Sequence, residues 1–182
     1  MAQSKSMLEI REAREQEYLP LGDLTVKVYA NLLNMPGPEV MPDYFELLRD
    51  VAGRAATPSV KIFVALDDNQ TLLGGVTYIG DMKYYGSGGT AGEVKNAAGF
   101  RLLAVNPDVR GGGVGRALTE HCINRAKQDG VDKVIIHTTQ SMQVAWSMYE
   151  KIGFIRFPEI DFDQNGLAVY GFYLPVNTKV AK

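Results

Sequence analysis

Apolar residues follow two different spacings along the chain, and the two spacings alternate. In some short stretches the apolar residues are continuous or alternate with polar ones, which is typical of strands. Elsewhere they recur every three to four residues, which is typical of helices with one buried face. We therefore expect strands at residues 7–13, 60–66, 71–79, 97–105, 133–139 and 167–174, and helices at 24–33, 44–53 and 114–128.

Turn-forming residues separate these stretches. The turn at residues 67–69 joins two adjacent strands and predicts an antiparallel hairpin, and the glycine-rich residues 86–92 form a flexible loop. Pro36, Pro38 and Pro42 divide the first two helices, because proline interrupts a helix interior. The final strand alternates apolar residues and is expected to pair antiparallel. The pattern predicts a mixed sheet covered by helices on both faces.

Size and composition restrict the class of protein. With 182 residues, 46% of them apolar, the chain is long enough for one domain over residues 1–182 with a substantial core. A net charge of −2 argues against sequence-independent binding to nucleic acid or to an anionic membrane. We see neither a signal peptide nor an apolar stretch of membrane-spanning length, and expect a cytoplasmic protein. Cys122, the only cysteine, excludes an internal disulfide and lies on an apolar helix stripe, as a buried structural thiol would.

Residues 103–118 run from an apolar strand through a turn and a glycine cluster into a helix. The first N–H groups of a helix lack intrahelical partners, and the helix dipole adds partial positive charge, so such a loop can hold a phosphate with main-chain groups alone. The loop has no Lys-Ser or Lys-Thr of a nucleotide P-loop, and it does not complete the dinucleotide Gly-x-Gly-x-x-Gly pattern. A Rossmann-type protein would also need an acidic residue about 20 positions further on, at a second strand end, which neither Glu120 nor Asp129 supplies.

Two motifs carry a more specific resemblance. Arg110, Gly113 and Gly115 form Arg/Gln-x-x-Gly-x-Gly/Ala directly after a strand that ends in Ala-Val-x-Pro. Residues 143–154, after a further strand, match the helix signature Ala-x-x-x-Tyr-Glu-Lys-x-Gly-Phe. Together the motifs span residues 97–157 and resemble the GCN5-related N-acetyltransferase (GNAT) superfamily. The resemblance implies a mixed α/β (α+β), three-layer acyl-CoA N-acyltransferase fold with a mostly antiparallel central sheet.

The resemblance also implies where acetyl-CoA binds as co-substrate. Main-chain groups at the end of the strand would meet the pantetheine arm, the glycine loop would hold the pyrophosphate, and the start of the later helix would complete the site. Two arginines at a helix N-terminus oppose the helix dipole, and a bound anion would offset them. The residues implied are Leu103, Ala104, Val105, Arg110, Gly111, Gly112, Gly113, Val114, Gly115, Arg116, Ser141, Ala145 and Tyr149. This chain has Met142 where relatives often carry an asparagine, so a polar contact there would come from Ser141 or the backbone.

Tyr149 is our candidate general acid. The family transfers an acetyl group to a primary amine by direct attack in a ternary complex, and an acid assists the departing CoA thiolate. A neutral tyrosine can donate to that sulfur, and a positioned acid typically contributes about 10²- to 10⁴-fold in rate. The alternative is that Tyr149 is an ordinary core residue on an amphipathic helix.

A general base is harder to assign. At pH 7 only about one in 10³ lysine-type amines is unprotonated, so a proton has to leave. Many relatives place a glutamate on the strand at residues 97–105, but here its only charge is Arg101. Glu93, acting through water, is one candidate, Asp161 and Asp163 are others, and a base-free route stays open. His121 and His137 are too isolated to predict a metal site, and we interpret both as structural or surface residues.

The acceptor amine is left open by the sequence. Candidate substrate-lining residues are Tyr84, Tyr85, Phe157, Asp161 and Phe162, and aromatic rings beside a carboxylate suit a cationic amine. A small-molecule amine and a peptide or protein amine both remain open, as does association into a homodimer. A rival from another class is a non-catalytic acyl-CoA binding or sensing module with the same fold, which would not need a thiolate acid.

Overall fold

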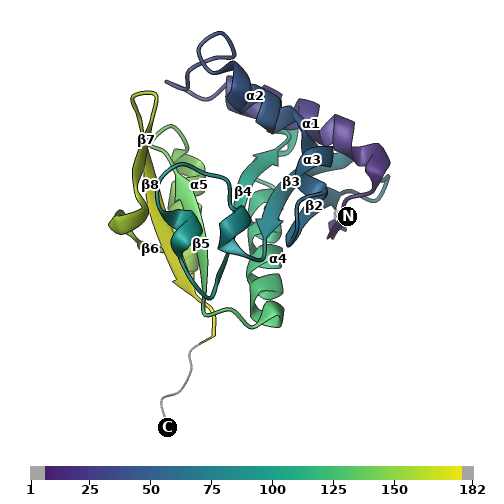
Figure 1. Cartoon of the computed structure of the whole chain (residues 1–182). Helices are drawn as coiled ribbons and strands as arrows, with labels where there is room; N and C mark the ends of the chain where they lie inside the picture. Colours follow the sequence, from purple (N-terminus) through teal and green to yellow (C-terminus); the bar gives the residue numbers. More distant parts are fainter. Residues whose placement is uncertain (1–6, 178–182) are drawn as a thin grey trace.

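The computed structural model describes residues 7–177 and contains one continuous sheet with helices on both faces (Figure 1). The strands are β1 (Glu9–Glu12), β2 (Val60–Leu66), β3 (Leu72–Ile79), β4 (Ala97–Val105), β5 (Lys133–Thr138), β6 (Ile155–Arg156), β7 (Phe162–Gln164) and β8 (Leu167–Pro175). The α-helices are α1 (Glu15–Ala30), α2 (Pro42–Arg49), α3 (Val51–Ala55), α4 (Val114–Asp129) and α5 (Gln143–Ile152). Short 3₁₀ turns are η1 (Met82–Tyr84), η2 (Ala91–Glu93), η3 (Pro107–Val109) and η4 (Pro158–Ile160).

The sheet is mixed and mostly antiparallel, which confirms the expected fold class. Its strand order is β1-β2-β3-β4-β5-β8-β6, and β7 pairs with β8. Every pairing is antiparallel except that of β4 with β5. That parallel pairing covers only Ala97–Gly99 against Lys133–Ile135. Beyond it β4 and β5 separate, so the sheet opens in its middle.

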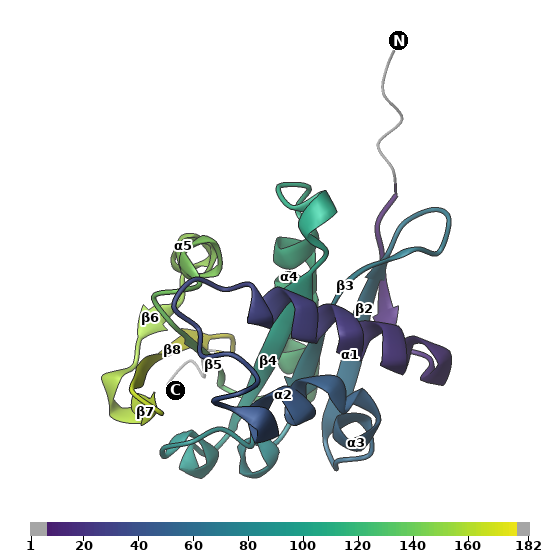
Figure 2. The same cartoon turned by 90° about the horizontal axis from the view of Figure 1, so that it is seen from above.

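The helices form a layer on each face of the sheet (Figure 2). Alternate residues of β2 show this: Phe63 and Ala65 belong to the cluster that includes Leu118 and Cys122 of α4, whereas Ile62 and Val64 pack with Leu21 of α1. Burial of apolar side chains on both faces supplies the main favourable free energy of folding. Among residues 7–177, no helix is both long and apolar enough to cross a membrane.

Two of the expected helices differ from the structure. The first begins at Glu15 rather than at residue 24, because the side chain of Glu17 accepts the Arg14 N–H at 2.8 Å and burial of the following turns outweighs the interruption at Pro20. The second is divided into α2 and α3 at Asp50, whose side chain accepts the Gly53 N–H at 2.9 Å and so starts a new helix.

The short strands β6 and β7 were absent from the sequence expectations. The turn between β7 and β8 consists of Asn165 and Gly166, both at positive φ (52° and 84°). Asn-Gly is the preferred pair for a two-residue hairpin turn, so this hairpin had a sequence signal. Strand β6 is only two residues long and carries no comparable signal.

Candidate functional site

A β-bulge shapes β4 next to the point where β4 and β5 separate. Gly75 of β3 pairs with Ala104 of β4, and Thr77 pairs with Arg101. A step of two residues on β3 therefore corresponds to a step of three residues on β4. Leu102 adopts φ 58°, a left-handed conformation that is costly for a branched side chain. Because of the extra residue, side chains after Leu102 point to the opposite faces of the sheet from those that regular alternation would give them. Arg101 and Leu102 therefore both lie beneath α2 and α3, while the side chain of Leu103 packs in the cluster that includes α4 and Tyr149.

A groove of about 450 Å³ runs along the open edge of β4. Its walls are the end of β4, the glycine loop and first turn of α4, and the first turns of α5. It collects most of the residues predicted to bind acetyl-CoA: Leu103, Val105, Arg110, Gly111, Gly113, Val114, Gly115, Arg116, Ser141 and Ala145. Of the other three, Ala104 is buried, Gly112 is exposed within the loop, and Tyr149 lies in a separate cavity.

The glycine loop offers a set of main-chain donors to this groove. Within residues 7–177, the N–H groups of Gly111, Gly113, Val114, Gly115 and Arg116 donate no hydrogen bond. A Cβ at Gly111 or Gly113 would meet nothing within 4 Å, and these two residues have φ of 84° and 83°. Glycine is thus needed for the left-handed backbone, and the space above the loop is open. Unpartnered donors at the start of a helix fit a pyrophosphate.

The two arginines of the loop differ in their surroundings. Arg116 pairs with Glu120, one turn further along α4, with its Nε 2.9 Å from a carboxylate oxygen. Arg110 is exposed and forms no ion pair with any residue from 7 to 177. Arg110 is therefore the cation of the loop that is available to an incoming anion.

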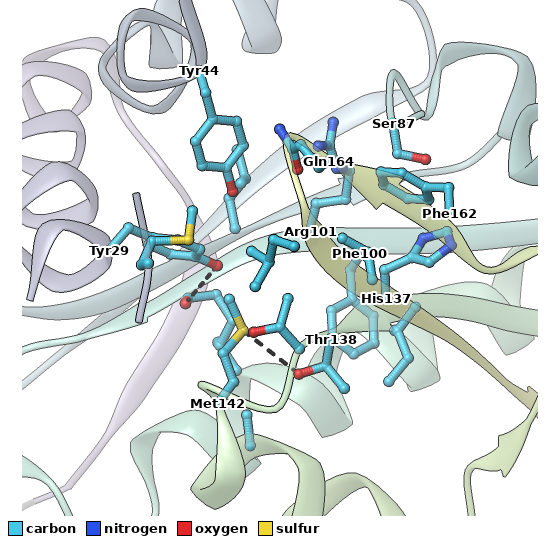
Figure 3. A pocket seen from close by; sticks show the side chains of 18 of the residues that line it. Tyr29, Tyr44, Ser87, Phe100, Arg101, His137, Thr138, Met142, Phe162 and Gln164 are labelled. Atoms are coloured by element: carbon cyan, nitrogen blue, oxygen red, sulfur yellow. Dashed lines mark hydrogen bonds between the residues drawn. The ribbon is translucent and has the colours of Figure 1, made fainter. Parts of the chain in front are cut away.

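A smaller cavity of about 100 Å³ lies beyond the inner end of the groove, between the separated strands (Figure 3). The groove and the cavity share four lining residues, Tyr29, Leu103, Met142 and Ala145. Around the cavity Figure 3 shows side chains of β4, β5 and β7: Phe100, Arg101, His137, Thr138, Phe162 and Gln164. Tyr29 and Tyr44, from the helices α1 and α2, close its other side.

Tyr149 reaches this cavity from α5, one turn after Ala145. It is 5% exposed and packs edge to face against Phe100 and Phe154, at ring-centroid distances of 5.9 and 5.6 Å. Its hydroxyl has no hydrogen-bond partner among the described residues, and Tyr149 is one of the residues that line the cavity. Burial raises the pKa of Tyr149 well above the ordinary tyrosine value, so the hydroxyl stays protonated near neutral pH.

His137 and Tyr85 form a hydrogen-bonded pair on the cavity wall. The His137 Nε2 lies 2.8 Å from the carbonyl oxygen of Ile160, which can only accept, so Nε2 carries a proton. Burial lowers the pKa of His137, and the neutral ring therefore presents Nδ1 as an acceptor. The Tyr85 hydroxyl lies 3.1 Å from Nδ1 and donates to it. A neutral base is thus connected to the cavity through a tyrosine hydroxyl.

Several other candidate residues lie outside this arrangement. Glu93 is exposed in η2 and lines neither the groove nor the cavity. Asp161 accepts two hydrogen bonds from Arg156, at 2.9 and 2.6 Å, and one from the Gly171 N–H at 2.6 Å. Tyr84 lines a third hollow beneath α2 and α3, and Asp163 accepts the Gly166 N–H at 2.8 Å. Catalytic or substrate-binding roles for these residues stay predictions.

Sequence reasoning missed four residues of the cavity. Tyr29 donates a 3.3 Å hydrogen bond to the carbonyl oxygen of Leu103, and Tyr44 packs edge to face against Tyr29. Arg101 was noted only as the charge of its strand, and His137 was interpreted as structural or surface. No sequence signal marks Tyr29 and Tyr44, because α1, α2 and β4 meet only in the tertiary structure. An uncompensated charge in an otherwise apolar strand was the clue that Arg101 offered.

Comparisons with known proteins identify the family. The model of the "Acetyltransferase (GNAT) family" matches residues 26–154, well over half of the chain. A mycothiol acetyltransferase of Kocuria rhizophila is 36% identical over 55 residues, which cover 30% of this chain and 18% of that protein. The chain spans less than a third of the length of the first curated relatives that it matches.

Solved structures agree in fold. A GNAT-family acetyltransferase from Staphylococcus aureus has a TM-score of 0.70 at 15% identity, over 94% of this chain and 100% of that one. A Salmonella typhimurium protein solved with its cofactor acetyl-CoA has a TM-score of 0.64 at 15% identity, with 96% of both chains covered. The two motifs, the opened sheet and the matching family model lead to one conclusion: this chain belongs to the GNAT family of acetyltransferases.

Proposed function

We propose that this protein is an acetyl-CoA-dependent N-acetyltransferase that transfers the acetyl group directly to a primary amine in a ternary complex. The observation that carries the proposal is the continuity of the site. A groove with five unpartnered main-chain donors at one end leads, through Tyr29, Leu103, Met142 and Ala145, to a cavity that holds a protonated tyrosine. Membership of the GNAT family, whose named members are acetyltransferases, supports the same activity.

In this proposal the loop binds the pyrophosphate through its N–H groups, with Arg110 adding charge. The side chains of Leu103, Ala145 and Met148 provide apolar walls for the pantetheine arm. When bound, acetyl-CoA supplies an activated acetyl thioester. The groove leads from the loop to the four residues shared with the cavity, one of which, Ala145, lies one turn before Tyr149.

Tyr149 acts as the general acid. As the carbon–sulfur bond breaks, its hydroxyl gives a proton to the departing sulfur, so that no free thiolate forms in the cavity. The high pKa of a buried tyrosine makes it a weak acid, but the sulfur leaves in the same poorly solvated space, where the thiolate is also more basic. Phe100 and Phe154 hold the ring in place.

The amine attacks as the neutral free base, and the proton that it loses as the new bond forms leaves through Tyr85 and His137. As the new carbon–nitrogen bond forms, the amine proton moves to the Tyr85 oxygen, and the Tyr85 hydroxyl proton moves to Nδ1 of His137. The imidazole becomes an imidazolium that still donates from Nε2 to the Ile160 carbonyl. After the products leave, the imidazolium loses this proton to solvent and Tyr149 regains one from solvent, which restores both groups. This route replaces the glutamate that many relatives carry on the equivalent of β4. Tyr85 and His137 both line the cavity, whereas Glu93 does not.

A non-catalytic acyl-CoA sensor is the rival function. It would need the groove but not an acid and a base on the cavity wall. The unpartnered Tyr149 hydroxyl and the Tyr85–His137 pair therefore favour the enzyme.

Calorimetric binding of acetyl-CoA, with desulfo-CoA and NAD as comparators, followed by thiol release against a panel of amines, tests the proposal. We expect acetyl-CoA to bind and CoA release to depend on an added amine. Binding without release on any amine would support the sensor, and no binding of acetyl-CoA would overturn the proposal.

A further inference from the structure

The arginines and carboxylates around the cavity between β4 and β5, where we place the acceptor amine, are unevenly distributed. All the Asp and Glu residues of the chain fall within residues 7–177, yet none lines the cavity between β4 and β5. None lines the adjoining hollow of about 190 Å³ beneath α2 and α3 either. Arg101 lines both spaces, and Arg54 lines the second. The residues that line these two spaces thus include two arginines and no carboxylate.

Arg101 has most of its donors free. A guanidinium carries five N–H donors, and Arg101 uses one of them in the described structure, a 3.0 Å hydrogen bond to the Tyr85 carbonyl oxygen. Its guanidinium carbon also lies 5.4 Å from the centroid of the Tyr85 ring. No carboxylate of residues 7–177 comes within 4 Å of it. Arg101 is half-buried, and none of its nitrogens belongs to the buried polar atoms without a partner, so its remaining donors are accessible to an anion.

Arg54 has a different, structural role. It donates to Thr77 Oγ1 at 3.1 Å and to the carbonyl oxygens of Leu47 and Leu48, and so ties α2 to β3. Burial and the nearby Arg101 lower the pKa of Arg54 to about 10. Arg54 therefore adds positive potential behind Arg101 but has few donors to offer a ligand.

We propose that the acceptor is a small amine that also bears a carboxylate, and that Arg101 binds this carboxylate. The inference rests on the proposed function and names its substrate class. The planar fork of a guanidinium matches a carboxylate and can hold it with two parallel hydrogen bonds. Arg101 and Leu103 both line the cavity, and Leu103 is one of the residues that the cavity shares with the groove, so the carboxylate would sit in the same space as the shared end of the groove, where the amine attacks.

The size of the cavities fits a small acceptor. Together with the adjoining hollow, the cavity offers space for a molecule of amino-acid size and is bordered by Tyr29, Tyr44 and Tyr85. Asp161, the carboxylate that the sequence suggested for a cationic acceptor, is held instead by Arg156. The arrangement suits an amino carboxylate better than a diamine, whose second cation would face Arg101.

Matched substrate pairs test the inference. The α-amino acids, β-alanine and 4-aminobutyrate are each compared with their own carboxamide, and 1,4-diaminobutane is included. We expect kcat/KM for at least one amino carboxylate to exceed that of its carboxamide by about 10- to 100-fold, as charge-assisted hydrogen bonds usually contribute. In Arg101→Gln this ratio falls to about one, and Arg101→Lys, which keeps the charge but not the fork, is intermediate.

Arg49→Gln is the matched control, because it removes an exposed arginine from α2 and should leave the ratio unchanged. Acetyl-CoA affinity of each variant checks that the fold is intact. The inference is overturned if the carboxamides or the diamine are the better acceptors, or if the carboxylate preference persists in Arg101→Gln.

A second measurement does not depend on turnover. N-acetyl amino acids and their carboxamides are titrated into the protein in the presence of CoA. We expect the acids to bind about 10-fold more tightly, and the advantage to disappear in Arg101→Gln. Failure of the proposed function would show as no acetyl-CoA binding or no CoA release. Failure of this inference would show as no preference for carboxylates in a protein that binds acetyl-CoA.

Discussion

At the scale of single residues, the proposed mechanism depends on two groups, Tyr149 and His137, whose protonation is set by burial. Tyr149 is held neutral and is free to donate, while His137 is held neutral and is free to accept through Tyr85. The sequence motif marked Tyr149. Nothing in the sequence marked His137, because its partners Tyr85 and Ile160 are 52 and 23 positions away.

Tyr149→Phe removes the proposed acid and keeps the ring that packs against Phe100 and Phe154. We expect kcat to fall by about 10²- to 10⁴-fold while acetyl-CoA affinity changes by less than about twofold. Steady-state kinetics and calorimetry measure the two quantities. An unchanged kcat, with chemistry shown to be rate-limiting, would remove the acid role. Tyr170→Phe, on β8, is a control that deletes a hydroxyl outside the proposed mechanism.

His137 predicts an acid limb in the pH profile of kcat. Its pKa lies below the ordinary 6.5 because burial and the charges of Arg101 and Arg156 disfavour the imidazolium, outweighing Asp161 and the Ile160 hydrogen bond. We therefore expect kcat to be sustained at pH 6.5 and to fall as pH drops through a midpoint below that value. His137→Gln should lower kcat by about 10²-fold and abolish this limb. A profile identical to that of the parent would exclude the route through His137.

At the scale of elements, the loop before α4 and the segment after α5 are stabilised in different ways. The loop has unpartnered N–H groups and glycines at positive φ, so it is prepared for a ligand. The segment around η4 is held by its own ion pair, Arg156 with Asp161. In the proposed function the loop binds the pyrophosphate, while the segment after α5 leads to Phe162 and Gln164, which line the cavity.

Gly113→Glu places a carboxylate where the pyrophosphate is expected. Like charges in contact cost several kcal/mol, so acetyl-CoA affinity should fall by about 100-fold or more in calorimetry. Gly130→Glu is the matched control: Gly130 ends the same helix, has φ 75° and also has open space around its Cβ position. The two variants should lose similar stability, from similar backbone strain. If both bind acetyl-CoA as the parent does, the assignment of the loop is wrong.

Asp161→Asn should destabilise the protein by about 1 kcal/mol, since the ion pair with Arg156 is about one-third exposed and partly screened. The pKa of Asp161 is lowered from its usual 3.8, mainly by the Arg156 hydrogen bonds. Its contribution is therefore present above pH 3.8 and is lost as pH falls through the lower, folded-state pKa. Chemical denaturation of parent and variant between pH 7 and 3 checks this. Glu159→Gln, at an exposed neighbouring position, should show no such loss.

At the scale of the whole molecule, the site exists because the sheet opens. β4 and β5 pair over three residues each and then separate, and α1, α2 and α5 close around the gap. A ligand in the groove would bridge the two halves of the sheet. Ligand binding to the native state alone raises stability by mass action.

Acetyl-CoA at about 100 times its Kd should therefore stabilise the protein by about 2.7 kcal/mol, or raise Tm by roughly 5 to 10 °C. Thermal unfolding monitored by circular dichroism measures the shift, and desulfo-CoA should produce a similar one because it has the same pyrophosphate. A shift equally large in Gly113→Glu would contradict binding at the loop.

The amino-acid sequence by itself determined most of the fold and most of the groove. Local hydrophobic spacing placed the long strands and α4, and contiguous motifs marked the loop and Tyr149, because both depend on residues close together in the chain. Only the tertiary structure decided the acceptor side. The bulge at Leu102, which places Leu102 beside Arg101 on the face under α2 and α3, and the meeting of Tyr85 with His137 depend on contacts between distant segments. Such contacts leave no local pattern, so the chemistry of the acceptor cavity could not be inferred before the strands were in place.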